Sequence, residues 1–312
     1  MSIIAALTGS YSREEPAIRE IVQRTGFTYL TDADMVAKAS RLSGLSERKI
    51  QKAFCARTPV FNQLTHEKEL SVAYLKLALA ETLMDDNIFI NGFTSLLIPH
   101  SIADVLRICI ISDMKSRSLA AVDFGLSEKK AFKVIHKDDK DRIMWARATW
   151  GKDDPWDSSL YDMVLPTNKM TTEEIGALIA ETIGKVAYMR TLYAKKVIED
   201  FVLASRVDVA TIKKGHYYVT AEADAGAVTL TINKNVLMLK RLENSLQYEA
   251  KKISGVTSVT TKVGKQFHQA DIVRKFDLVT PSKPFFVDDG RKFVPALSEK
   301  AVVRSERAHI RL

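Results

Sequence analysis

The chain has little of what marks secreted, metal-stabilised or membrane proteins. Its 312 residues include two cysteines, Cys55 and Cys109, and no Cys/His cluster with zinc spacing, which excludes a disulfide framework and a structural zinc site. No apolar run reaches the roughly 18 residues that a bilayer-spanning helix needs. The first residues lack the basic segment of a secretory signal. We therefore expect a cytoplasmic protein with no membrane span.

The charge of the chain is basic but dispersed. The net charge of +8 comes from 46 basic and 38 acidic residues, spread along the sequence more than gathered into one tract. Such a balance suits phosphate-bearing ligands. Because no helix-turn-helix, zinc or RNA-platform signature accompanies it, nucleic acid is not the partner we expect. The length favours two domains over one.

The first 190 residues have the pattern of an open α/β sheet. Residues 2–8 form a short apolar run that ends at a Gly-Ser turn, and residues 17–24 follow with helical spacing. Further short runs that are apolar on both faces predict buried parallel strands at residues 87–91, 105–112 and 161–165. Helices are predicted at residues 70–83, 127–150 and 175–183, the last opened by the capping box Thr171-Thr-Glu-Glu174.

A smaller α-β-β-α-β module is predicted at residues 195–264. Its elements are a helix at 195–205, strands at 216–222 and 227–232, a helix at 236–253 and a strand at 257–263. Asp224-Ala-Gly226 predicts a tight turn between the first two strands, and Gly255 a helix C-cap. The remaining residues, 265–312, are too few for a domain.

The turn after the first strand stands where phosphate loops occur, because backbone N–H groups and a helix N-terminus both attract anions there. The segment reads Gly9-Ser-Tyr-Ser-Arg-Glu-Glu15, with two acids where the full signature has glycine and lysine. A carboxylate about 4 Å from a triphosphate oxygen replaces an attraction by a repulsion of order 4 kcal/mol at an effective dielectric near 20. Taken alone, the segment fits an ordinary β–α turn better than a phosphate loop.

A second candidate is the basic region after the strand at 105–112. Asp113-Met-Lys115-Ser-Arg117 is followed by cations on the predicted helix, at Lys129, Lys130, Lys133, Lys137, Lys140, Arg142 and Arg147. One interpretation is a helical lid that supplies positive charge to a transferring phosphoryl group. The other is a solvated helix face on which the lysines pair with Glu128, Asp138, Asp139 and Asp141. Nearby, we expect Trp156 to be a core residue more than a base-stacking platform.

Three stretches together resemble the cytidylate kinase-like family of P-loop proteins. They are Gly9-Ser-Tyr-Ser-Arg13, Lys137-Asp-Asp-Lys-Asp-Arg142 with Trp145, and Asp154-Pro-Trp-Asp-Ser-Ser-Leu-Tyr-Asp162. The resemblance covers roughly residues 1–190 and implies a parallel sheet with a nucleoside monophosphate site and a lid. It also implies an ancestral transfer of the ATP γ-phosphoryl group to a pyrimidine monophosphate with Mg²⁺.

The resemblance assigns roles to particular residues. Gly9, Ser10, Ser12 and Arg13 would bind the cofactor phosphates, Arg117 and Arg142 would be the catalytic lid arginines, and Asn91 with Gly92 would lie near the monophosphate; no residue is assigned to a metal. The chain departs from the family at Glu14 and Glu15, where the family has Gly-Lys. The fold is therefore expected to persist while catalysis is in question.

Two weaker resemblances concern the rest of the chain. Residues 195–263 resemble a BON-type module, a small unit found in proteins that bind lipid surfaces or small ligands, which leaves a protein partner or a small ligand open. Residues 280–300 resemble the start of a response-regulator receiver domain, with Asp288 and Asp289 as its acidic pair. A disordered tail with an acidic turn is the preferred interpretation of 265–312.

Two functions follow from these observations. The preferred hypothesis is a regulatory, nucleotide-binding pseudokinase with weak or no phosphotransfer. The alternative is an active nucleoside monophosphate kinase that uses ATP and Mg²⁺ to phosphorylate CMP or a related monophosphate, with Arg13, Arg117 and Arg142 supplying the missing positive charge.

Overall fold

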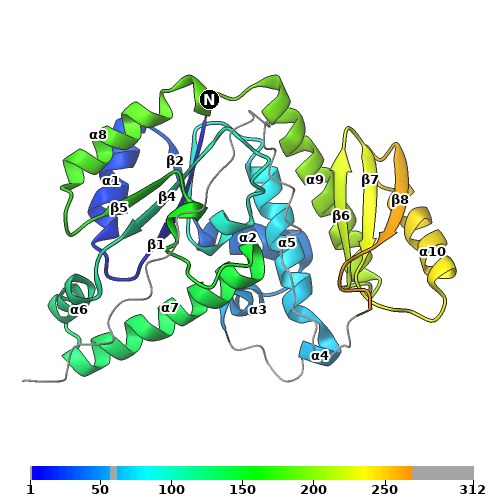
Figure 1. Cartoon of the computed structure of the whole chain (residues 1–312), viewed down its shortest axis with the longest axis horizontal. Helices are drawn as coiled ribbons and strands as arrows, with labels where there is room; N and C mark the ends of the chain where they lie inside the picture. Colours follow the sequence, from blue (N-terminus) through cyan, green and yellow to red (C-terminus); the bar gives the residue numbers. More distant parts are fainter. Residues whose placement is uncertain (1, 57–61, 269–312) are drawn as a thin grey trace, which may run out of the picture.

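A computed structural model describes residues 2–56 and 62–268 of the chain. It contains a five-stranded parallel sheet flanked by helices, beside a separate three-stranded sheet (Figure 1). The α/β architecture predicted from the sequence is confirmed.

The large sheet has the strand order β2-β3-β1-β4-β5, and all its strand pairs are parallel. Its strands are β1 (Ile3–Thr8), β2 (Thr28–Thr31), β3 (Ile88–Asn91), β4 (Val105–Ile111) and β5 (Met163–Pro166). All six residues of β1 are buried, because the strand is central and covered on both faces. This double burial explains its uninterrupted apolar sequence.

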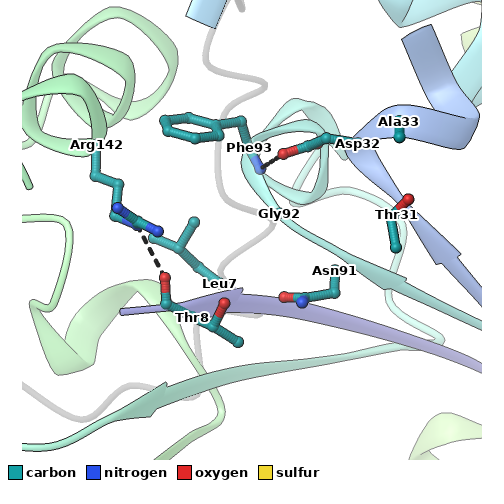
Figure 2. A pocket seen from close by; sticks show the side chains of 9 residues that line it. All are labelled: Leu7, Thr8, Thr31, Asp32, Ala33, Asn91, Gly92, Phe93 and Arg142. Atoms are coloured by element: carbon teal, nitrogen blue, oxygen red, sulfur yellow. Dashed lines mark hydrogen bonds between the residues drawn. The ribbon is translucent and has the colours of Figure 1, made fainter. Parts of the chain in front are cut away.

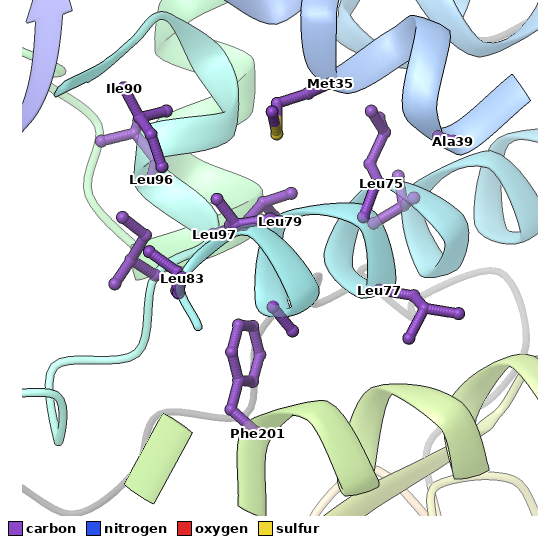
Figure 3. Packing of buried hydrophobic residues seen from close by; sticks show 14 of the residues in the cluster. Met35, Ala39, Leu75, Leu77, Leu79, Leu83, Ile90, Leu96, Leu97 and Phe201 are labelled. Atoms are coloured by element: carbon purple, nitrogen blue, oxygen red, sulfur yellow. The ribbon is translucent and has the colours of Figure 1, made fainter. Parts of the chain in front are cut away.

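Helices cover both faces of the large sheet. They are α1 (Glu14–Thr25), α2 (Asp32–Ser43), α3 (Glu47–Gln51), α4 (Asn62–Thr65), α5 (Glu67–Thr82), α6 (Met114–Asp123), α7 (Glu128–Trp150) and α8 (Thr172–Ile183). One core joins α1 and α8 to the sheet, and a second joins α2 and α5 to its other face (Figures 1 and 3). The predicted capping box at Thr171 and Glu174 is present at the start of α8.

The second part of the chain has the predicted element order. It comprises α9 (Leu192–Lys213), β6 (Val219–Asp224), β7 (Ala227–Ile232), α10 (Leu239–Lys251) and β8 (Ser258–Val263). β6 and β7 are antiparallel, and the turn between them has positive φ at Ala225 and Gly226, as a tight hairpin requires. α10 ends at Lys251 with Lys252 as its C-cap, so the predicted cap at Gly255 is wrong.

Helix α9 contributes residues to the core that contains α5 and to the core of the three-stranded sheet. Its residues Ile198, Phe201 and Val202 are buried in the core that contains α5, and Figure 3 shows the Phe201 ring pointing toward the apolar side chains of α5. Leu203 and Val207 of the same helix are buried against the three-stranded sheet. The two sheets are thus joined through one helix that both of them need.

A buried ion pair fixes this arrangement. Lys76 Nζ of α5 lies 2.7 Å from Asp208 Oδ2 of α9, and Asp208 Oδ1 accepts a hydrogen bond from Ala221 N of β6 at 2.7 Å. Asp208 therefore connects α9 to α5 on one side and to β6 on the other. Beyond β8, Phe267 is buried in the smaller core. The receiver-like segment at 280–300 lies outside the described residues.

Candidate functional site

A pocket of about 240 Å³ lies at the carboxyl ends of the central strands (Figure 2). It is lined by Leu7, Thr8, Thr31, Asp32, Ala33, Asn91, Gly92, Phe93 and Arg142. From β1 the chain runs to β2 at one edge, and from β3 it crosses to β4 on the other side of β1. Ligands of open α/β sheets bind at such a switch point, outside the carboxyl ends of the strands. Asn91 and Gly92, predicted for the monophosphate site, both line it.

One wall of the pocket is built by Asp32 and the turn after β3. The Asp32 carboxylate accepts hydrogen bonds from Phe93 N at 2.7 Å and from Thr94 N at 2.9 Å. Gly92 has a φ of 126°, and a Cβ atom there would collide with this carboxylate, so the turn requires glycine. Burial raises the pKa of Asp32 above its ordinary value. The sequence interpretation missed Asp32, although an aspartate directly after a short strand was the available signal.

The turn after β1 is held by two arginines. Arg142 donates from Nε to Thr8 O at 2.8 Å and from Nη2 to Ser10 Oγ at 3.1 Å, and Arg117 donates from Nε to Ser10 O at 2.9 Å. Gly9 is needed here because a Cβ atom would collide with the Ile111 side chain. The structure therefore brings Gly9, Ser10, Arg117 and Arg142 together, and of these four residues Arg142 alone lines the pocket.

Two other predicted loop residues point elsewhere. Ser12 is fully buried, and its hydroxyl accepts a hydrogen bond from Ser112 N at 3.3 Å. Arg13 is the N-cap residue of α1 with a left-handed φ of 52°, and its largely exposed guanidinium lies 3.7 Å from Asp123 of α6. The structure does not bring Ser12 or Arg13 to the pocket.

The two acids at the end of the loop form the first turn of α1. Glu14 is half-buried and Glu15 is exposed. Burial raises the pKa of Glu14, and the nearby positive charge of Arg142 opposes this shift. Glu14 thus places a poorly solvated carboxyl group beside the arginine that holds the loop.

The positive charge of both arginines is partly matched by α7. Arg117 donates to both carboxylate oxygens of Asp139, at 2.9 and 2.7 Å, and Asp138 accepts from Ser10 Oγ at 3.0 Å. Burial lowers the pKa of Arg142, and Asp139 and Asp138 oppose this shift. Arg117 is therefore engaged through all three guanidinium nitrogens, and Arg142 through Nε and Nη2.

Trp156 packs on both guanidinium groups. The carbon centres of Arg117 and Arg142 lie 5.8 and 6.0 Å from its ring centroid, within the range of cation–π attraction. Trp156 also packs against the main core as a partly buried residue. Its role combines core packing, as predicted, with a contact to the site that the sequence interpretation missed.

The lysines of α7 point to solvent, whereas Asp138, Asp139 and Asp141 of the same helix accept hydrogen bonds. Lys129, Lys130, Lys133, Lys137 and Lys140 are all exposed, and none of them forms an ion pair within the described part of the chain. Asp138 and Asp139 bind Ser10 and Arg117, and Asp141 accepts from Ala56 N at 2.6 Å. The exposed lysines fit the solvated helix face, one of the two sequence interpretations, although they do not pair with the acids of their own helix.

Two potential Mg²⁺ ligands close to the loop already have hydrogen-bond partners. Mg²⁺ in phosphate sites is held by one or two carboxylates or hydroxyls together with phosphate oxygens. Here the Ser12 hydroxyl is buried and bonded to Ser112, and the Asp113 carboxylate caps α6 by accepting from Ser116 N. Within residues 2–56 and 62–268, no group of three or more His, Cys, Asp or Glu side chains has the spacing of a metal site.

Comparisons with known proteins were made for sequence and for fold. The family model described as "Cytidylate kinase-like family" matches residues 11–169, about half of the chain. No curated protein matches the sequence. Among the described residues no helix is both long and apolar enough to cross a membrane.

Two solved structures are similar to parts of this chain. An uncharacterized protein from Eubacterium ventriosum is 16% identical with a TM-score of 0.41, covering 58% of this chain and 97% of its own. Shikimate kinase from Acinetobacter baumannii, solved in complex with shikimate, is 10% identical with a TM-score of 0.31, covering 59% of this chain and 93% of its own. Because the family match covers α7 and the Trp156 segment, the chain belongs to the cytidylate kinase-like family and is a nucleotide-binding, kinase-like protein.

Proposed function

We propose that this protein is a pseudokinase, which holds a nucleotide at the pocket beside β1 and transfers phosphate weakly or not at all. The observation that carries the proposal is the contact of both site arginines with the loop itself. Arg142 donates to Thr8 O and Arg117 to Ser10 O, whereas phosphoryl transfer needs cations aimed at the phosphate. A triphosphate that bound Arg117 or the Nε atom of Arg142 would have to displace these bonds first.

The charge of the loop supports the same conclusion. In the family signature a lysine follows the glycine of the loop, and here Glu14 and Glu15 stand at the start of α1. A helix N-terminus attracts anions, but two carboxylates in its first turn already use that attraction. ATP binding in the usual pose is therefore expected to be weak.

The size of the pocket also limits the ligand. Its volume of about 240 Å³ is below the roughly 300 Å³ at which small-molecule sites begin. Part of a nucleotide fits between Thr8, Asn91 and Arg142, with the remainder outside. We infer that a nucleoside monophosphate is a better ligand than ATP for this pocket.

Calorimetry on designed variants tests the proposal. The double variant Glu14→Gly with Glu15→Lys is expected to bind ATP at least tenfold more tightly than the natural chain. The control is Glu173→Lys, because Glu173 is exposed in the first turn of α8 and is not one of the residues that line the pocket. Equal ATP affinity in the double variant and the natural chain would show that the loop is not a phosphate site.

The alternative function, an active kinase with ATP and Mg²⁺, is supported by the presence of Arg117 and Arg142 beside the loop. A coupled assay of ATP consumption with CMP, UMP and AMP separates the two functions. Turnover in the ordinary kinase range of about 1–100 s⁻¹ would overturn the pseudokinase proposal.

We further propose a regulatory role for the second module. The division into residues 1–190 and 195–264, the BON-like character of the module and the cytoplasmic location are parts of this proposal. Helix α9 supports this proposal, because it packs both on the smaller sheet and on α5. A protein partner or small ligand that binds the smaller sheet can therefore affect the larger one through α9. This coupling is tested by hydrogen exchange of the α5 amides, measured with residues 219–268 free and with an antibody fragment bound to them. Unchanged protection of the α5 amides would contradict it.

A further inference from the structure

Helix α7 carries aspartates that bond to the rest of the fold and lysines that are exposed. Asp138, Asp139 and Asp141 face the loop and the residues around it, where each accepts a hydrogen bond. Lys129, Lys133, Lys137 and Lys140 face away from the fold and are exposed. At 100° per residue these four lysines fall within about 80° of one another around the helix axis. We call these lysines, with Phe132 and His136 between them, the cationic face.

The positive charge of this face is not neutralised within the described protein. None of the four lysines forms an ion pair in residues 2–56 or 62–268. Lys130, exposed beside them, has no ion pair in that region either. The three aspartates of the same helix all accept hydrogen bonds. An anion that approaches from solvent therefore meets a row of cations, with the exposed carboxylate of Glu128 at the first residue of the helix, before the row begins.

Aromatic side chains interrupt this row. Phe132 is 52% exposed, and it lies between Lys129 and Lys133 in the sequence. The exposed His136 ring meets it edge to face, with centroids 4.2 Å apart. A single exposed aromatic residue is ordinary at a protein surface, but one set among lysines matches a ligand that carries both negative charge and flat rings.

We propose that the cationic face of α7 binds single-stranded nucleic acid, through phosphate contacts to Lys129, Lys133, Lys137 and Lys140 and base stacking on Phe132. From Lys129 to Lys140 the row extends about 16 Å at 1.5 Å per residue, enough for several nucleotides. Proteins that bind single strands without sequence preference combine a positive track with aromatic platforms in this way.

The face fits other polyanions less well. An anionic membrane would require more insertable apolar surface than Phe132 and the 38% exposed Met144 provide on this side of α7. A nucleic acid duplex keeps its bases stacked and would leave Phe132 without a partner. An acidic protein segment could pair with the lysines but gains nothing specific from the Phe132 and His136 rings.

Fluorescence anisotropy with a labelled 20-nucleotide oligo-U tests the proposal on the whole chain. The binding constant is measured between 50 and 200 mM salt for the natural chain and for Lys129→Gln/Lys133→Gln/Lys137→Gln. Because each phosphate contact contributes about 0.7 to the logarithmic salt slope for single strands, the triple variant is expected to lose about 2 from that slope. The variant changes no residue of the nucleotide pocket.

A matched control removes the same charge elsewhere. Lys195→Gln/Lys196→Gln/Lys213→Gln replaces three exposed lysines of α9 and is expected to keep the natural salt slope. Phe132→Ala is expected to weaken oligo-U binding at least about fivefold while preserving the slope, which separates stacking from charge.

Three outcomes would overturn the proposal. One is the absence of oligo-U binding at 50 mM salt; another is equal loss of binding in the α7 and α9 triple variants. The third is binding of poly-glutamate to the natural chain with no binding of oligo-U, which would assign the face to an acidic protein instead. Thermal melts of each variant confirm that these surface changes leave the fold intact.

Discussion

Arg117 of α6 and Asp139 of α7 form a two-pronged ion pair at the side of the phosphate loop. The distances are 2.9 Å from Nη1 to Oδ2 and 2.7 Å from Nη2 to Oδ1, and both residues are buried. The same guanidinium donates from Nε to Ser10 O. One arginine thus fixes α6, α7 and the loop relative to one another.

Removing one partner of this ion pair is expected to lower the free energy of unfolding more than removing both partners. Arg117→Leu leaves the Asp139 carboxylate buried and unpaired, and is expected to lower the free energy of unfolding by about 3–5 kcal/mol. The double variant Arg117→Leu/Asp139→Leu is expected to be more stable than the sum of the two single changes predicts. Urea unfolding of the two single variants and the double variant measures the three changes in the free energy of unfolding. Strict additivity would mean that the two charges do not interact.

Glu14 is expected to make stability depend on pH. Its pKa in the folded chain is raised above the ordinary value of 4.5, so its contribution to stability is complete below pH 4.5 and is lost as the pH rises through the folded pKa. Glu14→Gln imitates the protonated form. Its melting temperature is therefore expected to exceed that of the natural chain at pH 7 and to equal it at pH 4.

Glu15→Gln serves as the control for this measurement, because Glu15 is exposed in the same helical turn. At pH 7, Glu15→Gln is expected to change the melting temperature less than Glu14→Gln does. If Glu14→Gln lowers the melting temperature at pH 7, the attraction of Glu14 to Arg142 and to the helix N-terminus outweighs its burial.

Gly92→Ala is expected to damage the pocket wall. The new Cβ atom would collide with the Asp32 carboxylate at a φ of 126°, costing about 2–4 kcal/mol through backbone strain and weakened hydrogen bonds to Phe93 and Thr94. Gly125→Ala is the matched control, since Gly125 also has a positive φ but open space around it. Thermal melts of both variants measure the difference. Equal losses would show that the Asp32 contact adds nothing.

Asp208→Ala is expected to destabilise both sheets together. It leaves Lys76 without its partner in a largely buried position and Ala221 N without an acceptor, a loss of about 3–5 kcal/mol. Glu199→Ala, at an exposed position of the same helix, is the control and is expected to change stability little. Two separate unfolding transitions in the Asp208 variant would show that the sheets are less coupled than α9 indicates.

In the larger sheet, the sequence predicted the buried strands and missed the polar edge strand. β1 and β4 are mainly apolar because both faces are covered, with Arg107 buried within β4, whereas β2 has no buried residue and was not predicted. α6 was missed for a related reason: its buried members include Arg117, whose burial depends on Asp139 from another helix. Local sequence patterns identify buried segments that are apolar. They fail where a charged residue is buried because it forms an ion pair.

The candidate site was predicted in part. Glycines at positions 9 and 92 identified the two turns, since each turn excludes a Cβ atom. The direction of each charged side chain could not be predicted, because Asp138 and Asp139 lie next to Lys137 and Lys140 in the sequence. Only the packing of Ile135 and Trp145 fixes the rotation of α7, and with it which charges face the loop.

Because α9 completes the core around α5, the order of synthesis matters. Residues 198, 201 and 202 supply part of the apolar cover for the larger sheet's core, so that core stays open until the ribosome has released a further stretch of chain. At about 5–20 residues per second, this interval lasts seconds after the last strand of the larger sheet has been made. During that time the nascent chain exposes the apolar side of α5, which makes it a candidate for chaperone capture.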